Sequence, residues 1–248
     1  MDLQTFFAEN NKVALAFSGG TDSSYLLFAA MHYGAQVKAY YIHTAFQPEF
    51  ELEDAKRMAE LLHADMEVIE LDALSDSQVA ANPENRCYYC KINLFRELRE
   101  HSRQDGYAVL IDGTNASDDA GDRPGMKALE ELSVRSPLRE CQLSKEEIRG
   151  LSKEAGLFTW NKPAYACLAT RIPAGSRITE EILSKVENSE NFLFSLGYTD
   201  FRVRVIGDNA KLQFPENQLK QVIDQRKIII GELKKYFKSV LLDMESRE

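Results

Sequence analysis

The sequence predicts an α/β protein in which a parallel sheet is followed by a smaller α+β domain. From residue 13 to about residue 156, short apolar runs typical of strands alternate with segments of helical spacing. Strands separated by helices favour a parallel sheet that is covered on both faces. After residue 176 the order changes to helix, strand, strand, helix and strand. We therefore expect two domains, at residues 1–175 and 176–248.

Apolar periodicity predicts the elements of the first domain. Leu52, Ala55 and Ala59, for example, recur on one side of a predicted helix. Ser144, followed three residues later by Glu147, matches a capping box, which we assign to helix initiation alone. The expected elements are strand 13–17, helix 23–33, strand 37–43, helix 49–63, strand 66–71, helix 89–104 and strand 107–112.

The second domain follows a stretch that shows neither the helical nor the strand period. Residues 160–176 contain glycine and proline and are expected to form a loop. The turn Gly207-Asp208-Asn209 lies between two predicted strands, which is typical of a β-hairpin. The expected elements are helix 179–196, strands 200–206 and 210–214, helix 216–237 and strand 239–243.

Composition excludes several classes of protein. With 248 residues and 44% hydrophobic residues, the chain is long and apolar enough to bury a core without disulfides. Its 30 basic and 39 acidic residues give a net charge of −9, so we expect no nucleic-acid partner. No apolar run approaches the roughly 18 residues of a membrane span, and the N-terminal sequence lacks the pattern of an export signal. We expect a cytoplasmic protein that does not bind membranes.

The sharpest motif is SGGTDS at residues 18–23, between a predicted strand and a predicted helix. Glycines let the backbone approach a ligand closely, and amide groups at a helix N-terminus bind anions. The alternative is a structural Gly-Gly turn with an Asp or Ser helix cap. No Lys-Ser/Thr pair follows the glycines, so the motif is not a Walker loop. Its expected ligand-binding residues are Ser18, Gly19, Gly20, Asp22 and Ser23.

This motif resembles the PP-loop of the ATP pyrophosphatase superfamily, whose members activate a carbonyl or carboxyl oxygen as an AMP ester. The resemblance implies ATP as a substrate and a Mg²⁺ ion beside the pyrophosphate. A second polar cluster, at residues 112–119, follows the fourth predicted strand. Its Gly113 and Thr114 could face the nucleotide, or the cluster could be a loop with an Asx or Ser cap.

The chain has four cysteines, and three of them suggest a metal site. Cys87 and Cys90 form a C-x-x-C at the start of a predicted helix, and Cys167 lies in the predicted loop 160–176. Three thiolates would hold three irons of a [4Fe–4S] cluster and leave the fourth iron open. The alternatives are a redox C-x-x-C unrelated to Cys167, or three structural thiols. Cys141 is expected to be an inert thiol.

Four longer segments resemble the LarE family of PP-loop sulfur transferases, which build the nickel-pincer nucleotide of lactate racemase. These segments are residues 85–91, 122–125, 136–138 and 162–173, and the match runs in order from about residue 6 to residue 243. The resemblance implies that ATP adenylylates the carboxylates of pyridinium-3,5-biscarboxylate mononucleotide. Sulfur then displaces AMP and gives the thiocarboxylates.

The resemblance also assigns the cysteines. Cys167 corresponds to a cysteine that some members sacrifice as their sulfur source. Members with two further cysteines, like Cys87 and Cys90 here, use a [4Fe–4S] cluster that carries a transferable sulfide. We therefore expect a sulfide source as a partner and several turnovers per chain. Because family members assemble as hexamers, we also expect a homo-oligomer, with residues 176–248 binding substrate or neighbouring subunits.

Two arginines alternate in the predicted strand 200–206, so Arg202 and Arg204 project from the same face. Guanidinium groups suit carboxylates and phosphates, although a solvated strand face would show the same pattern. The resemblance places both arginines in the substrate site as catalytic residues with Cys167, and Glu190 as an acidic partner. Arg171 is a further expected contact for the anionic nucleotide.

The chain departs from the family pattern at two places. Lys211 and Gln213 stand where we expect Arg and Glu, which puts a role for that strand in doubt, and Thr170 replaces a serine. The rival predictions are a cluster-dependent tRNA thiolase, an amide-forming synthetase, and a non-catalytic iron–sulfur or zinc module. The negative charge weakens the first, and release of AMP from ATP would exclude the last.

Overall fold

The computed structural model describes residues 1–118 and 123–247, which form two compact units. The first unit comprises Met1–Ala73 and Asn85–Lys162, and the second comprises Leu74–Glu84 and Pro163–Glu248. The contacts thus divide the chain before the expected boundary at residue 175. Asn82 ties residues 74–84 to this second unit, because its side chain donates hydrogen bonds to the carbonyls of Ile172 (3.3 Å) and Pro173 (2.9 Å).

The first unit contains a parallel sheet of four strands, which confirms the predicted α/β class. The strands lie in the order β3-β2-β1-β4, and all of their pairings are parallel. Each expected strand and helix of this region is present, with its ends shifted by a few residues. The strands are β1 (Lys12–Ala16), β2 (Gln36–His43), β3 (Asp65–Glu70) and β4 (Val109–Ile111). The helices are α1 (Leu3–Glu9), α2 (Thr21–His32), α3 (Glu49–Leu62), α5 (Arg86–Gln104), α6 (Arg123–Glu131), α7 (Pro137–Glu140) and α8 (Lys145–Glu154).

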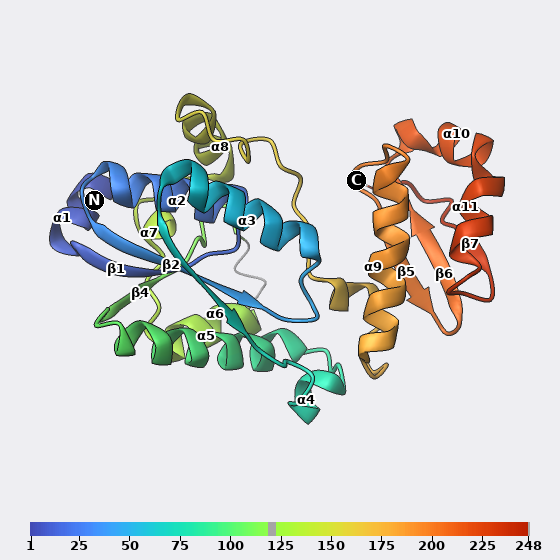
Figure 1. Ribbon diagram of the computed structural model, residues 1–248, viewed down its shortest axis with the longest axis horizontal. Coiled ribbons are helices and arrows are strands. Elements are labelled where there is room, and N and C mark those ends of the chain that lie inside the picture. The colour runs from blue at the N-terminus through green and yellow to red at the C-terminus, as the bar shows by residue number, and fades with distance from the viewer. Residues whose placement is uncertain (119–122, 248) are drawn as a thin grey trace. The chain divides into compact units, whose positions relative to one another are not determined.

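Helices cover both faces of this sheet, with α2 and α3 on one side and α5 and α6 on the other (Figure 1). Val13 and Leu15 of β1 enter the core on the α2 side, and Ala14 between them enters the core on the α5 side. Both faces of β1 are therefore dry. This explains why the strand is a continuous apolar run instead of an alternating one.

The strand order defines a switch point at β1. The chain runs outward from β1 through β2 to β3 and then returns to form β4 on the other side of β1. The loops that follow β1 and β4 therefore depart in opposite directions from the carboxyl edge of the sheet. In open parallel sheets this divergence is where ligands bind.

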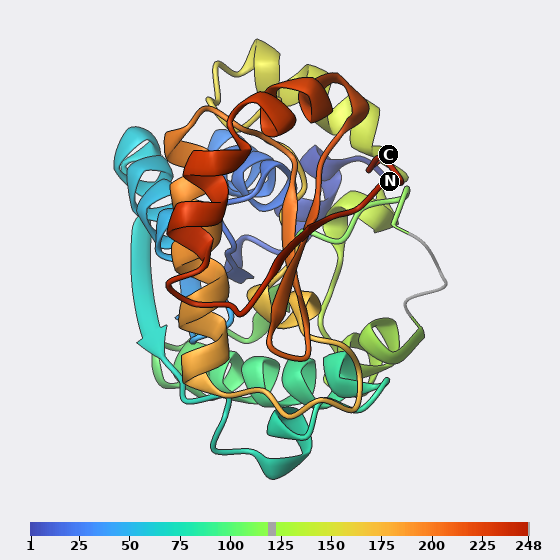
Figure 2. The same cartoon turned by 90° about the vertical axis from the view of Figure 1, so that its right-hand side faces the viewer.

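The second unit contains a three-stranded sheet in the order β5-β6-β7. The β5–β6 pair is the expected antiparallel hairpin, and Figure 2 shows α9 lying alongside it. Its elements are α4 (Ser77–Ala80), the 3₁₀ helix η1 (Leu168–Arg171), α9 (Glu180–Ser195), β5 (Arg202–Ile206), β6 (Asn209–Gln213), α10 (Glu216–Asp224), α11 (Arg226–Leu233) and β7 (Val240–Leu242).

The expected helix 216–237 is two helices, so that prediction was wrong. The break falls at Gln225, whose side-chain oxygen accepts a hydrogen bond from the Tyr198 hydroxyl at 2.9 Å. The turn there lets Val222 of α10 and Ile229 of α11 both enter the core of the unit. The apolar period continues across Gln225, so periodicity alone predicts a single helix and does not show the break.

The sheet of the second unit has one apolar face and one polar face. Val203 and Leu212 lie on the buried face with the packed rings of Phe201 and Phe214, whose centroids are 5.5 Å apart. Arg202 and Arg204 project from the opposite face, as predicted from their spacing. In the described parts of the chain, no helix is long and apolar enough to cross a membrane.

Candidate functional site

The loop of residues 18–23, which we call the phosphate loop, contains a glycine that no other residue can replace without strain. Gly19 has φ of 67°, in the left-handed region, and a Cβ at this position would lie 2.9 Å from the Cα of Ala55 in α3. The loop is therefore pressed against α3 at a distance that only glycine allows. The predicted need for glycine thus has two independent structural causes.

The N-terminus of α2 is open to a ligand. Its N-cap is Gly20, and no side chain in the described residues caps the helix. The hydroxyls of Ser18 and Ser23 lie 3.0 Å apart beside this end. Thr21, in contrast, is buried and donates its hydroxyl hydrogen to the carbonyl of Thr159 at 2.8 Å, so it anchors the helix. The two hydroxyls contact each other, and the Gly20 amide donates to the Ser18 hydroxyl at 3.4 Å, so the anion site offered here is the uncapped N-terminus of the helix with two hydroxyls beside it.

Asp22 is the charged residue of the loop. Its Oδ2 lies 2.5 Å from Nζ of Lys145, the first residue of α8. Its Oδ1 is buried and has no hydrogen-bond partner among the described residues. A carboxylate oxygen without a partner beside an anion-binding loop fits a hard cation such as Mg²⁺.

The loop after β4 forms the second wall of this site. A Cβ on Gly113 would lie 3.0 Å from the backbone nitrogen of Ser23, so this loop lies directly against the first turn of α2. Asp112 accepts hydrogen bonds from the hydroxyls of Ser136 (2.6 Å) and Thr114 (2.5 Å). Burial raises the pKa of Asp112, although these hydrogen bonds oppose the rise. Gly113 therefore lies beside the phosphate loop, and the Thr114 hydroxyl donates its hydrogen bond to Asp112.

The same loop connects to α8. The amide of Ser117 donates to the side chain of Asn115 (2.8 Å), which is the Asx turn considered as the alternative. The Ser117 hydroxyl in turn accepts from the backbone nitrogen of Lys145 (2.9 Å). Residue 119 of this cluster and residue 122 of the family-like segment 122–125 lie outside the described residues.

The capping box at the start of α8 is confirmed, since Ser144 and Glu147 exchange both of its hydrogen bonds. The sequence assigned only helix initiation to this segment. We did not predict that Lys145 of this segment would contact Asp22, which lies 123 positions earlier in the chain. No local pattern in the sequence signals such a contact.

Cys87 and Cys90 lie on the first turn of α5. Cys87 is exposed and accepts a hydrogen bond from the guanidinium of Arg86 at 3.7 Å, while Cys90 is half-buried. Helices that follow parallel strands begin at the carboxyl edge of the sheet. The charge of the neighbouring Lys91 is indeed felt at Asp112, where it is one of the influences that lower the carboxyl pKa.

Cys167 belongs to the second unit, where it is half-buried and precedes η1. Across residues 1–118 and 123–247, no three His, Cys, Asp or Glu side chains form a group that could hold a metal ion. The structure thus places Cys87 and Cys90 on one helical turn and Cys167 in a different unit. Burial raises the pKa of Cys141, which suits the inert thiol expected there.

Glu190 and Arg171 form a buried ion pair in the second unit, and each side chain is only 1% exposed. Arg171 donates from Nε to Oε1 (2.9 Å) and from Nη2 to Oε2 (3.1 Å) of Glu190. Burial alone would lower the pKa of Arg171, but the carboxylate of Glu190 outweighs burial and raises it. The Tyr165 hydroxyl and the Val203 amide also donate to Glu190. In the structure the anion that Arg171 contacts is Glu190, and the expected contact of Arg171 with the anionic nucleotide stays a prediction.

Arg202 and Arg204 hydrogen-bond neutral groups. Arg202 donates to the carbonyls of Phe201 (2.6 Å) and Ala164 (2.9 Å). Arg204 donates to the carbonyl of Thr170 (3.0 Å) and to the side chain of Gln213. Burial lowers the pKa of both guanidinium groups, and the positive charge of Arg171 lowers it further. Arg202 also forms a longer ion pair with Asp200, 3.9 Å from its Nη1, so the hydrogen-bond partners named here are neutral but a carboxylate lies close to Arg202.

The two departures on β6 are accommodated by Asp243. Lys211 forms an ion pair with this carboxylate at 2.7 Å, and the Gln213 amide donates to it at 2.8 Å. Gln213 thereby joins Arg204 to Asp243. Thr170 keeps the hydroxyl of the expected serine and donates it to the carbonyl of Cys167 at 2.8 Å.

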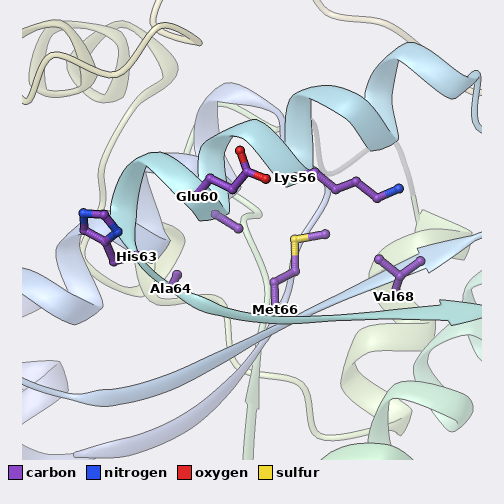
Figure 3. A pocket seen from close by; sticks show the side chains of 7 residues that line it. Lys56, Glu60, His63, Ala64, Met66 and Val68 are labelled. Atoms are coloured by element: carbon purple, nitrogen blue, oxygen red, sulfur yellow. The ribbon is translucent and has the colours of Figure 1, made fainter.

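A hollow of about 550 Å³ lies between α3 and β3 of the first unit. Glu60 and His63 approach it from the helix, and Met66 and Val68 from the strand (Figure 3). None of the residues that line this hollow belongs to the predicted site. The candidate site of the first unit is instead the edge formed by the loops after β1 and β4.

A glycine loop without a Walker lysine lies at the switch point of a parallel sheet, which is the arrangement expected of a PP-loop enzyme. Comparison with known proteins agrees. Residues 12–87, which span the loop and the first three strands, match the family described as queuosine biosynthesis protein QueC. The chain is 37% identical over 252 residues to an uncharacterized protein of Synechocystis sp., with 98% of this chain and 92% of the relative covered. It is 32% identical over 238 residues to an uncharacterized protein of Methanocaldococcus jannaschii, covering 96% and 91%.

A third relative has a named activity. The chain is 33% identical over 210 residues to the pyridinium-3,5-bisthiocarboxylic acid mononucleotide synthase of Lactiplantibacillus plantarum, covering 84% of this chain and 76% of the synthase. The chain belongs to the LarE family, and it is a PP-loop ATP-dependent sulfur transferase.

Proposed function

We propose that this enzyme adenylylates the carboxylates of pyridinium-3,5-biscarboxylate mononucleotide and converts them to thiocarboxylates for the nickel-pincer nucleotide. The observation that carries this proposal is the 33% identity to a synthase whose name states the bisthiocarboxylic product. The open phosphate loop supports it, because it can hold a triphosphate without a lysine in the loop itself.

The chemistry needs two steps at each carboxylate. A carboxylate is a poor electrophile, so one of its oxygens first attacks the α-phosphorus of ATP and pyrophosphate leaves. A sulfur nucleophile then attacks the acyl carbon, and AMP leaves with the electron pair of the broken C–O bond. The amides of the Gly19–Gly20 turn and the N-terminus of α2 would hold the β- and γ-phosphates. Asp22 would hold Mg²⁺ through its unpartnered Oδ1, and the ion supplies positive charge to the leaving pyrophosphate.

Cys87, Cys90 and Cys167 would hold a [4Fe–4S] cluster, which supplies a renewable sulfide when it is bound. The helical spacing of Cys87 and Cys90 supports this role, because residues three apart on a helix have Cβ atoms about 5–6 Å apart. The hydrogen bond from Arg86 to the sulfur of Cys87 also suits a thiolate ligand.

Arg202 and Arg204 would bind the anionic groups of the substrate. Apart from the 3.9 Å ion pair between Arg202 and Asp200, both guanidinium groups donate to neutral acceptors, and a guanidinium can exchange a carbonyl acceptor for an anionic one. Glu190 would act by holding Arg171 and, through it, the segment that carries Cys167. The second unit would thus supply substrate binding, and it is also where we place contacts within a homo-oligomer.

Anaerobic purification with iron and product assays tests the proposal. With ATP, excess sulfide and the dicarboxylate nucleotide, we expect several thiocarboxylates per chain and about four irons per chain. Cys87→Ala, Cys90→Ala and Cys167→Ala should each lose iron, and Cys141→Ala is the matched control that should keep it. Iron retained in Cys167→Ala would contradict the three-cysteine site. At most one thiocarboxylate per chain would contradict a renewable sulfide.

A further inference from the structure

Lys145 brings a positive charge to a phosphate loop that has none of its own. Its Nζ lies 2.5 Å from Oδ2 of Asp22, in the first turn of α2. The Lys145 side chain is 35% exposed, so its ammonium group is held beside the loop without being sealed from a ligand.

The position of Lys145 is built by several contacts. Its backbone nitrogen donates to the Ser117 hydroxyl at 2.9 Å, and the adjacent Ala116 amide donates to the Leu143 carbonyl at 2.9 Å. The residue before it, Ser144, is locked in the capping box. Lys145 therefore differs from an ordinary surface lysine, because the start of α8 is tied to the loop that follows β4.

A bound triphosphate creates a charge problem at this place. The N-terminus of a helix carries about half a positive charge, whereas the β- and γ-phosphates carry several negative charges. Asp22 adds a further negative charge within the first turn of α2. The Mg²⁺ proposed at Oδ1 of Asp22 offsets part of this charge, and Lys145, on Oδ2 of the same carboxylate, adds a second positive charge on this side of the loop.

We propose that Lys145 is a pyrophosphate-binding residue, which supplies from α8 the lysine that the loop lacks. With ATP bound, its ammonium group bridges Asp22 and an oxygen of the β- or γ-phosphate. When the bond between the α-phosphorus and the bridging oxygen breaks, its electron pair stays on pyrophosphate, and Lys145 stabilises that charge. The contribution to leaving-group departure rests on the proposed adenylylation, whereas the binding contact does not depend on which carboxylate is activated.

Calorimetric binding of three ligands tests this role. We compare pyrophosphate, the nonhydrolysable analogue α,β-methylene-ATP, and AMP, which lacks the β- and γ-phosphates. For Lys145→Met we expect the affinity for the first two to fall roughly ten- to a hundredfold, the range for one charge-assisted hydrogen bond, and AMP affinity to change less than about twofold. Lys145→Arg should recover most of the loss. Lys153→Met, on the same helix but paired with the Trp160 ring, is the control and should bind like wild type.

Two results would overturn the proposal. Equal loss of AMP and α,β-methylene-ATP binding would mean that Lys145 only supports the fold, and unchanged pyrophosphate binding would mean that it contacts no phosphate. The double variant Asp22→Asn/Lys145→Met separates a third possibility. If Lys145 merely neutralises Asp22, the double variant should bind α,β-methylene-ATP as well as Asp22→Asn does; we expect it to bind more weakly. If wild type binds ATP but forms no thiocarboxylate, the proposed function fails while the Lys145 contact stands.

Discussion

The phosphate loop of the first unit and the arginine face of the second unit, which comprises Arg171, Arg202 and Arg204, are both suited to anions. They are built differently. At the loop, the N-terminus of α2 has no side-chain cap, and Asp22 keeps one carboxylate oxygen without a partner among the described residues. On the arginine face, Arg171 is paired with Glu190, and Arg202 and Arg204 donate to neutral groups. At the phosphate loop, the amides at the N-terminus of α2 are uncapped. On the arginine face, the guanidinium groups already donate to other groups of the second unit.

The difference follows from what holds each donor in place. Amides at a helix N-terminus are held in position by the helix backbone, so they keep their direction when no ligand is bound. A guanidinium on a long side chain has to be immobilised by hydrogen bonds. Arg202 and Arg204 are immobilised by carbonyls of the segment that carries Cys167, so ordering the arginines also orders that segment. We therefore expect substitutions on the arginine face to reduce the stability of the second unit. Substitutions in the phosphate loop should chiefly reduce ligand binding.

Glu190→Gln is expected to have the largest effect on stability. It removes the carboxylate that compensates a fully buried guanidinium, and breaking such a pair costs about 3–5 kcal/mol. Urea unfolding measures the loss, and hydrogen exchange at Val203, whose amide donates to Glu190, assigns it to the second unit.

The matched control for this change is Glu181→Gln on the same helix. Glu181 is 76% exposed and pairs with Lys185 in solvent, so its loss should change the stability far less than the loss of Glu190. Arg171→Met combined with Glu190→Gln should recover part of the stability, because no lone charge then remains buried. A cost below about 1 kcal/mol for Glu190→Gln alone would show that the pair is not the centre of this face.

Gly19→Ala tests the other side of the comparison. The new Cβ would meet the backbone of Ala55 at 2.9 Å, so the loop has to move and its amides lose their aim. We expect ATP affinity to fall roughly ten- to a hundredfold, because displaced amides lose charge-assisted hydrogen bonds to the phosphates. Gly34→Ala is the control, because Gly34 also has positive φ (78°) but nothing within 4 Å of its Cβ position. Both variants should lose roughly 1–2 kcal/mol of stability from the strained backbone, Gly19→Ala should lose more because of its contact with Ala55, and only Gly19→Ala should lose ATP binding.

These two regions were also unequally predictable from the sequence. The phosphate loop is contiguous, so Ser18 to Ser23 could be recognised from a strand, two glycines and a helix start. The capping box at Ser144 and the hairpin turn at Gly207 are local patterns of the same kind, and both are present. Local patterns report local geometry, and in these segments tertiary packing agrees with it.

Contacts between distant segments could not be predicted in this way. Nothing near Asp22 in the sequence points to Lys145, and nothing near Asn82 indicates that its segment joins the second unit. The helix break at Gln225 was missed because the apolar period continues across it. The burial of Arg171 was missed because an arginine in a loop has the same pattern whether its partner is a substrate or Glu190.

Tyr165→Phe sharpens the comparison by a smaller change. It removes the hydroxyl that donates to Glu190 and keeps the ring, which lies 4.5 Å from the Arg171 guanidinium and 5.2 Å from that of Arg202. A hydrogen bond to a charged group contributes about 1.5 kcal/mol or slightly more, and we expect that loss in urea unfolding. Tyr198→Phe, whose hydroxyl donates to the neutral Gln225, should lose less. If Tyr165→Phe weakened ATP binding instead of stability, the separation of roles between the two regions would fail.

Asp112→Asn is expected to have the smallest effect on stability. It tests a buried carboxyl group of the first unit, as Glu190→Gln does in the second. Burial raises the pKa of Asp112 above its ordinary value of 3.8, so the folded state keeps a proton that the unfolded state loses first. The free energy of unfolding of wild type should therefore fall as pH rises from about 4 to the raised pKa. Asparagine does not ionise, so the variant should lack this slope, and the difference in stability between variant and wild type should shift in favour of the variant across that window. The measurement is urea unfolding of both proteins at a series of pH values. A difference that stays constant with pH would show that Asp112 is ionised behind the loop, held by Ser136 and Thr114, and that the carboxyl edge of the sheet tolerates a second negative charge close to Asp22.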